Sequence, residues 1–80
     1  MDKIYIVIFI TRDGSFFSSN ETTSEIHKIF RTKQKAKDWI LNEWGLEVDE
    51  NDKVKFNVKE YSKTDVDYEQ YIIEEYDLED

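Results

Sequence analysis

The side chains of this 80-residue chain that could carry chemistry are one histidine and scattered carboxylates, because the sequence contains no cysteine. Without thiols there is neither a disulfide nor a thiolate ligand for a zinc or iron–sulfur site. Metal binding and acid–base catalysis by histidine require a second group held beside the ring. His27 stands near Ile26 and Ile29, where an ordinary strand residue is the simpler interpretation. The sequence therefore predicts no catalytic residue, no metal ligand set and no cofactor.

Residues 49–52 resemble the start of a calcium-binding loop, since Asp49, Asn51 and Asp52 offer oxygen ligands in close succession. Such a loop requires glycine at its sixth position for a sharp turn, and Val54 stands there instead. We therefore interpret these residues as an acidic turn.

Charge is divided unevenly along the chain. Residues 1–37 carry a net charge of +3 and residues 38–80 a net charge of −11, which together give −8. Residues 64–80 contain eight carboxylates and neither lysine nor arginine. This segment predicts contact with a basic groove on another protein, mainly through these side chains: Asp65, Asp67, Glu69, Glu74, Glu75 and Asp77. An acidic surface that serves only solubility is the plainer alternative.

A basic cluster lies in the first half of the chain, where residues 28–37 contain five cations and Trp39 follows. Phosphate neutralisation by the cations and stacking on the indole would suit a nucleic-acid-binding accessory protein. The net charge of −8 repels polyanions at long range, which disfavours direct nucleic-acid binding.

The N-terminal segment has the pattern of a strand. In residues 4–10 isoleucine alternates with Tyr5, Val7 and Phe9, so both faces of the strand are apolar. That pattern is typical of a central strand in a sheet.

Turn signals follow this strand. Asp13 and Gly14 favour a tight turn that returns through residues 15–17, because glycine adopts turn conformations without a Cβ clash. The polar residues 18–24 predict a loop, and a second strand is predicted over residues 25–30.

The hydrophobic period then changes from two to about 3.6. From Thr32 to Trp44 the apolar residues Ala36, Ile40 and Trp44 recur at steps of four, which predicts an amphipathic helix packed through these side chains. Thr32 can cap its first N–H groups, or Arg31 is the cap position with Gln34 bonding back, and Gly45 suits the left-handed residue that ends a helix.

Two further strands are predicted over residues 54–58 and 68–78, where apolar and polar side chains alternate again. We therefore expect a single α+β domain over residues 1–80, in the order β-β-α-β-β. Its sheet would have four strands, antiparallel or mixed, with one helix packed on one face.

One helix can cover only one face of such a sheet, and we expect it to cover the isoleucines of the first strand. Tyr5, Val7 and Phe9 lie on the opposite side of that strand, and Tyr71 and Ile73 extend the same face. Exposed apolar patches on the order of a few hundred Å² mark interaction sites. The pattern predicts that a homodimer or a partner protein covers this second face.

The apolar run of residues 4–10 is too short for a membrane helix, which needs about 20 apolar residues. Arg12 and Asp13 follow it without a small-residue cleavage site, so it does not resemble a signal peptide. We expect a cytoplasmic protein with no membrane partner.

Three segments carry a resemblance to a group of small uncharacterised bacterial and phage proteins. Residues 30–40, FRTKQKAKDWI, are similar to their F-S-T-K-E-K-A-E-E-Y-I helix entry. Residues 3–7, KIYIV, resemble their opening strand, and residues 73–79, IEEYDLE, resemble their closing I-E-E-Y-x-L-D/E segment. Arg31 departs from the pattern, where serine is usual. The resemblance implies a small α+β fold and an origin in phages or prophages, and it brings no catalytic residue.

Together these observations predict a small acidic, non-enzymatic binding protein of phage or mobile-element type. The sharper hypothesis is an inhibitor of a host defence or DNA-handling protein, of anti-CRISPR or anti-restriction kind, whose carboxylates imitate nucleic-acid charge in the host cytoplasm. The alternatives are the nucleic-acid-binding accessory protein and an uncharacterised housekeeping domain.

Overall fold

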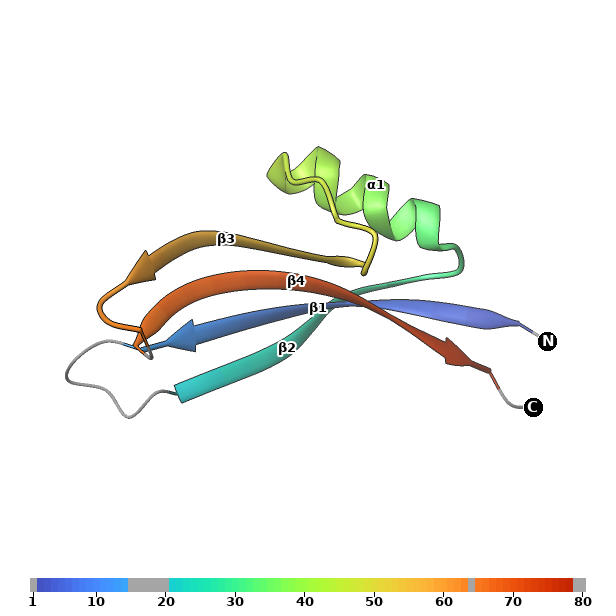
Figure 1. Cartoon of the computed structure of the whole chain (residues 1–80). Coiled ribbons are helices and arrows are strands. Elements are labelled where there is room, and N and C mark those ends of the chain that lie inside the picture. The colour runs from blue at the N-terminus through green and yellow to red at the C-terminus, as the bar shows by residue number, and fades with distance from the viewer. Residues whose placement is uncertain (1, 15–20, 64, 79–80) are drawn as a thin grey trace.

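The computed structural model describes residues 2–14, 21–63 and 65–78. Four strands form one antiparallel sheet in the order β2-β1-β4-β3, and the helix packs on one side of it (Figure 1). This confirms the predicted α+β fold with one helix. The elements follow in this order: β1 (Lys3–Asp13), β2 (Glu21–Phe30), α1 (Lys33–Trp44), β3 (Lys53–Glu60) and β4 (Val66–Asp77).

The strand that is apolar on both faces, β1, is central, as predicted. It pairs with β2 along one edge and with β4 along the other. Both backbone edges of β1 are therefore paired, and its side chains are apolar on both faces of the sheet, as the alternation in residues 4–10 indicates.

The prediction of a loop through residue 24 is wrong at its C-terminal end, because β2 already begins at Glu21. Thr22 and Thr23 pair with Arg12 and Thr11 of the long strand β1. Threonine is β-branched and suits a strand once a partner offers ladder hydrogen bonds. The predicted return through residues 15–17 lies outside the described residues.

Both edge strands contain a β-bulge. In β2, Lys28 pairs with Val7 and Ile26 with Ile8, so His27 is an extra residue. In β3 the register shifts between Phe56 and Lys59, where Asn57 has a positive φ of 51°.

The predicted helix and both of its caps are confirmed. Thr32 has extended backbone angles, and its side chain accepts a hydrogen bond from the Lys35 backbone N–H at 3.2 Å. Gly45 is left-handed with φ 67°, and its N–H donates to the Leu41 carbonyl at 2.8 Å. Ala36 and Ile40 are buried as predicted, while Trp44 remains 50% exposed.

The helix covers the face of the sheet opposite to the one expected. Val7 is fully buried in one cluster with Ala36 and Ile40, and Tyr5 and Phe9 pack against that cluster. The prediction that Tyr5, Val7 and Phe9 form an open partner-binding face is therefore wrong. These three side chains belong to the core.

The register of β3 explains which face the helix covers. Val54 pairs with Tyr71, so it lies on the same side of the sheet as the core, whereas Lys53 pairs with Ile72 and Lys55 with Gln70. A helix on the other side would cover two lysine side chains, whose burial without partners is costly. The apolar side of β3 therefore selects the Val7 face.

Tyr71 is the centre of the core and is fully buried. Its ring centroid lies 5.1 Å from that of Phe9, 5.8 Å from that of Phe56 and 5.7 Å from that of Trp44. Aromatic contacts at these separations stabilise a core beyond the area they bury. Trp44 therefore contributes to the core through one side of its indole.

Candidate protein-binding surfaces

The uncovered side of the sheet carries isoleucines from three strands. They alternate with the buried residues of β1 and β4, and α1 lies on the other side (Figure 1). We call this surface the isoleucine face and define it by these residues: Ile4, Ile6, Ile8, Ile10, Ile26, Ile29 and Ile72. Ile26 and Ile29 are 60% and 56% exposed, and the other five are partly buried by their neighbours. No element in residues 2–14, 21–63 or 65–78 covers this face.

Charged side chains of both signs share the isoleucine face. Lys53 and Lys55 lie beside Ile72 and Gln70, and Arg12 lies beside Tyr68. The carboxylates of the isoleucine face are Glu74, which pairs with Ile6, and Glu60, which pairs with Val66. The face is therefore close to neutral although the chain carries −8.

A second surface lies where β1 and β4 continue together beyond β2 and β3. The pairing of β1 with β2 begins at Tyr5 and that of β4 with β3 ends at Ile72, so Lys3 and Ile4 pair with β4 alone. This two-stranded extension carries both described chain ends (Figure 1). We call residues 2–4 and 74–78 the acidic arm.

The acidic arm holds four carboxylates and one cation. Asp2, Glu75 and Asp77 are exposed, and Glu74 is half-buried. Lys3 Nζ lies 3.2 Å from Glu75 Oε2. Through this hydrogen bond and its charge, Lys3 lowers the pKa of Glu75, and Glu75 in turn raises the pKa of Lys3. The net charge of the arm is therefore negative.

Two tyrosines lie in or beside the arm. The Tyr76 hydroxyl donates to Glu74 on the isoleucine side, and this hydrogen bond raises the pKa of Tyr76. Desolvation, followed by a hydrogen bond to Glu75, raises the pKa of Tyr5. Exposed Tyr76 and Leu78 add apolar area to the arm.

The six acidic residues predicted as one contact surface are divided between the two ends of β4. Glu74, Glu75 and Asp77 lie in the arm, while Asp65, Asp67 and Glu69 lie at the other end. Residues 70–73 separate the groups, and three of these four are buried. The sequence interpretation missed this division because it grouped the carboxylates by their closeness in the chain, without the strand pairing that buries the residues between them.

The carboxylates at the far end of β4 take part in local hydrogen bonds. Asp67 accepts from the Gly14 N–H at 2.7 Å and from the Tyr61 hydroxyl at 2.9 Å. Glu69 accepts from Asn57 Nδ2 at 2.6 Å. These carboxylates hold the strand ends together.

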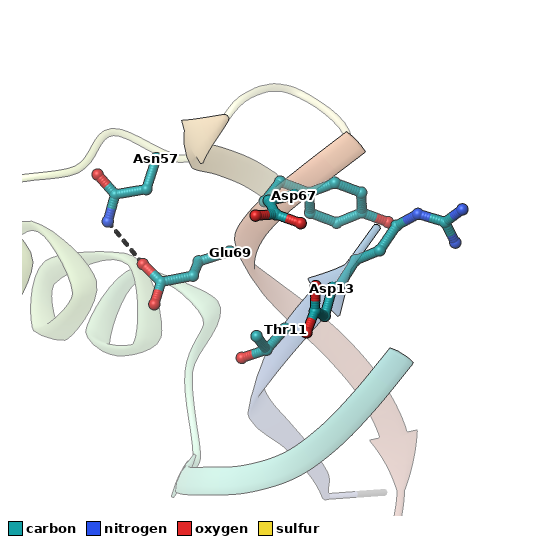
Figure 2. A pocket seen from close by; sticks show the side chains of 7 residues that line it. Thr11, Asp13, Asn57, Asp67 and Glu69 are labelled. Atoms are coloured by element: carbon teal, nitrogen blue, oxygen red, sulfur yellow. Dashed lines mark hydrogen bonds between the residues drawn. The ribbon is translucent and has the colours of Figure 1, made fainter. Parts of the chain in front are cut away.

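A shallow cavity of about 340 Å³ lies among these residues, and Figure 2 shows Asn57 bonded to Glu69 at one side of it. Thr11, Asp13 and Asp67 also line it. Among the residues that the structure describes, no three His, Cys, Asp or Glu side chains are grouped to hold a metal ion.

The acidic turn before β3 serves the backbone and the helix. Asp49 Oδ1 accepts the N–H groups of Asn51 at 2.8 Å and Lys53 at 3.1 Å. The Asp52 carboxylate lies 3.1 Å from Lys33 Nζ and 3.8 Å from Lys37 Nζ. Two members of the basic cluster are thus paired inside the molecule, and Asp52 raises the pKa of Lys33.

In the described part of the chain, α1 falls short of the length and apolarity that crossing a membrane would need.

No family model, curated protein or solved structure matches this chain.

Proposed function

We propose that this chain is a small, non-enzymatic protein-binding module that inserts the acidic arm into a basic groove of another protein. The observation that carries the proposal is the shape of the arm: β1 and β4 extend beyond β3, and at the tip also beyond β2, with four carboxylates and one lysine. A narrow acidic projection suits a groove that is lined with lysine and arginine.

The spacing of the carboxylates supports a groove that ordinarily holds nucleic acid. Glu75 and Asp77 are two residues apart on one face of β4, which places them about 6 to 7 Å apart. This separation is comparable with that of successive phosphates along one nucleic-acid strand. In its specific form the proposal is an inhibitor of a host defence or DNA-handling protein, in keeping with the phage-type resemblance.

The basic cluster favours this proposal over direct nucleic-acid binding. Lys33 and Lys37 are paired with Asp52, which leaves Lys28, Arg31 and Lys35 as the cluster's exposed cations. Nucleic-acid-binding domains normally present a broad basic surface on a basic chain, and this chain has a net charge of −8.

Charge reversal in the arm tests the proposal. The chain would be immobilised and exposed to bacterial lysate, and the proteins it retains should be released by added duplex DNA and by salt. Glu75→Lys with Asp77→Lys should reduce retention at least tenfold, because the partner groove would then face like charge.

Glu43→Lys with Glu47→Lys provides the matched control, since both side chains are exposed, lie outside the arm and give the same change in net charge. Retention should survive in this variant. Equal retention by the folded arm variant would contradict the proposal.

A further inference from the structure

The isoleucine face exposes an apolar surface of the kind that binds a partner. Seven isoleucines from β1, β2 and β4 lie on it, and Ile26 and Ile29 are more than half exposed. Gln70 on the same face is nearly buried among its neighbours. Large apolar patches of this kind on small domains mark interaction sites.

The charges on the face indicate which partner it suits. The residues of this face include three cations, Arg12, Lys53 and Lys55, and two carboxylates, Glu60 and Glu74. A strongly acidic partner would leave the two carboxylates of this face without an opposite charge, and a strongly basic partner would leave the three cations without one. A second copy of the face offers both signs, and this nearly neutral surface is where two chains of charge −8 would repel each other least.

The size of the face is sufficient for a dimer. All four strands are paired from Tyr68 to Ile72, over about 17 Å of length and about 19 Å of width, and three strands about 14 Å wide continue to Glu75 for about 10 Å more. The flat footprint is therefore roughly 460 Å² per copy, or roughly 900 Å² for two copies. Side-chain relief adds to this area, which brings it to the lower end of the range of specific interfaces, about 1,200 Å².

We propose that the isoleucine face binds the same face of a second copy of this chain. The two sheets pack face to face about 10 Å apart, as in a β-sandwich, and the two α1 helices lie on the outside. Such an interface is isologous, which means that both copies contribute the same surface, so the assembly ends at two copies. The arm carboxylates on the α1 side of the sheet, Glu75 and Asp77, stay available to another protein.

Sedimentation velocity and light scattering over a concentration series test this dimer. The purified chain should have twice the 9.7 kDa mass of one copy. Ile26→Lys with Ile29→Lys should weaken dimerisation at least tenfold, although it reduces the net negative charge and with it the long-range repulsion. Both side chains are exposed within one copy, so the fold should persist, as circular dichroism would show.

Leu41→Lys with Asn42→Lys is the matched control, because both side chains are exposed on α1, on the other side of the sheet. This variant makes the same change in charge and should remain dimeric. Lys53→Glu with Lys55→Glu supplies a second test of the face, and should also weaken the dimer because it removes the match of charges.

A folded wild-type chain that stays monomeric at about 0.5 mM would overturn the dimer, and so would equal weakening by the control. The result is separable from the arm proposal, since the arm variants change Glu75 and Asp77, which lie on the α1 side of the sheet, and are scored by retention of another protein. If the chain is monomeric and charge reversal in the arm still abolishes retention of another protein, the dimer is rejected and the arm proposal stands.

Discussion

The Tyr71 hydroxyl lies 3.2 Å from Nδ1 of His27, so a hydrogen bond joins β4 to β2 across the intervening strand β1. Phe9 of β1 lies between them, with its ring stacked on His27 at 5.0 Å. The bulge that inserts His27 into β2 makes this contact possible, because the extra residue turns its side chain toward the core.

Burial raises the pKa of Tyr71 above its ordinary value of 10.0, and this predicts a loss of stability in alkali. The folded state favours the neutral phenol. Its contribution is therefore complete below the unfolded pKa and is lost as pH rises through the folded pKa. Urea unfolding at a series of pH values between about 8 and 11 should show this loss, and Tyr71→Phe should reduce its pH dependence.

At neutral pH, Tyr71→Phe should cost about 0.5 to 1.5 kcal/mol, since it removes one hydrogen bond. Tyr68→Phe, on the other side of the sheet, is the control and should leave the alkaline loss in place. An unchanged pH profile in Tyr71→Phe would show that other groups cause the alkaline unfolding.

Val7→Glu should unfold the chain, because Val7 is fully buried beside Ala36 and Ile40. An unpaired carboxylate in this position should cost several kcal/mol, which is comparable with the roughly 5 kcal/mol total stability of a small domain. Circular dichroism should show loss of the native spectrum. Val58→Glu, at a half-exposed position, should remain folded. A folded Val7→Glu chain would contradict the core described above.

Gly14→Ala should destabilise the chain by about 1 to 3 kcal/mol through overpacking. A Cβ atom at this position would lie 2.5 Å from the Val66 backbone nitrogen and 2.6 Å from its carbonyl oxygen, which is too close for the strands to keep their places. Tryptophan fluorescence during urea unfolding would measure the change. Added stability, the usual result of replacing an unstrained loop glycine, would refute this close approach.

Local patterns were sufficient to predict the helix, both of its caps and the central position of β1. Thr32 and Gly45 act on backbone groups within four residues, so their roles are readable from neighbouring sequence. The alternation in residues 4–10 likewise needed no knowledge of the partner strands.

Features that depend on pairing between distant segments could not be predicted from such patterns. The face covered by α1 follows from the register of Val54 with Tyr71. The salt bridges from Lys33 and Lys37 to Asp52 join residues in different elements. Because both faces of β1 are apolar, its own sequence gave no basis for choosing between them.

The bulges at His27 and Asn57 also oppose fibrous aggregation through the edges of the sheet. Each of the two edge strands has one, and a bulge interrupts the regular row of backbone N–H and C=O groups and increases the local twist. Along β2 and β3 a strand from another molecule therefore finds no long, straight edge with which to pair. The edges discourage open-ended growth, so association is directed to side-chain surfaces, where an assembly can end at a defined number of copies.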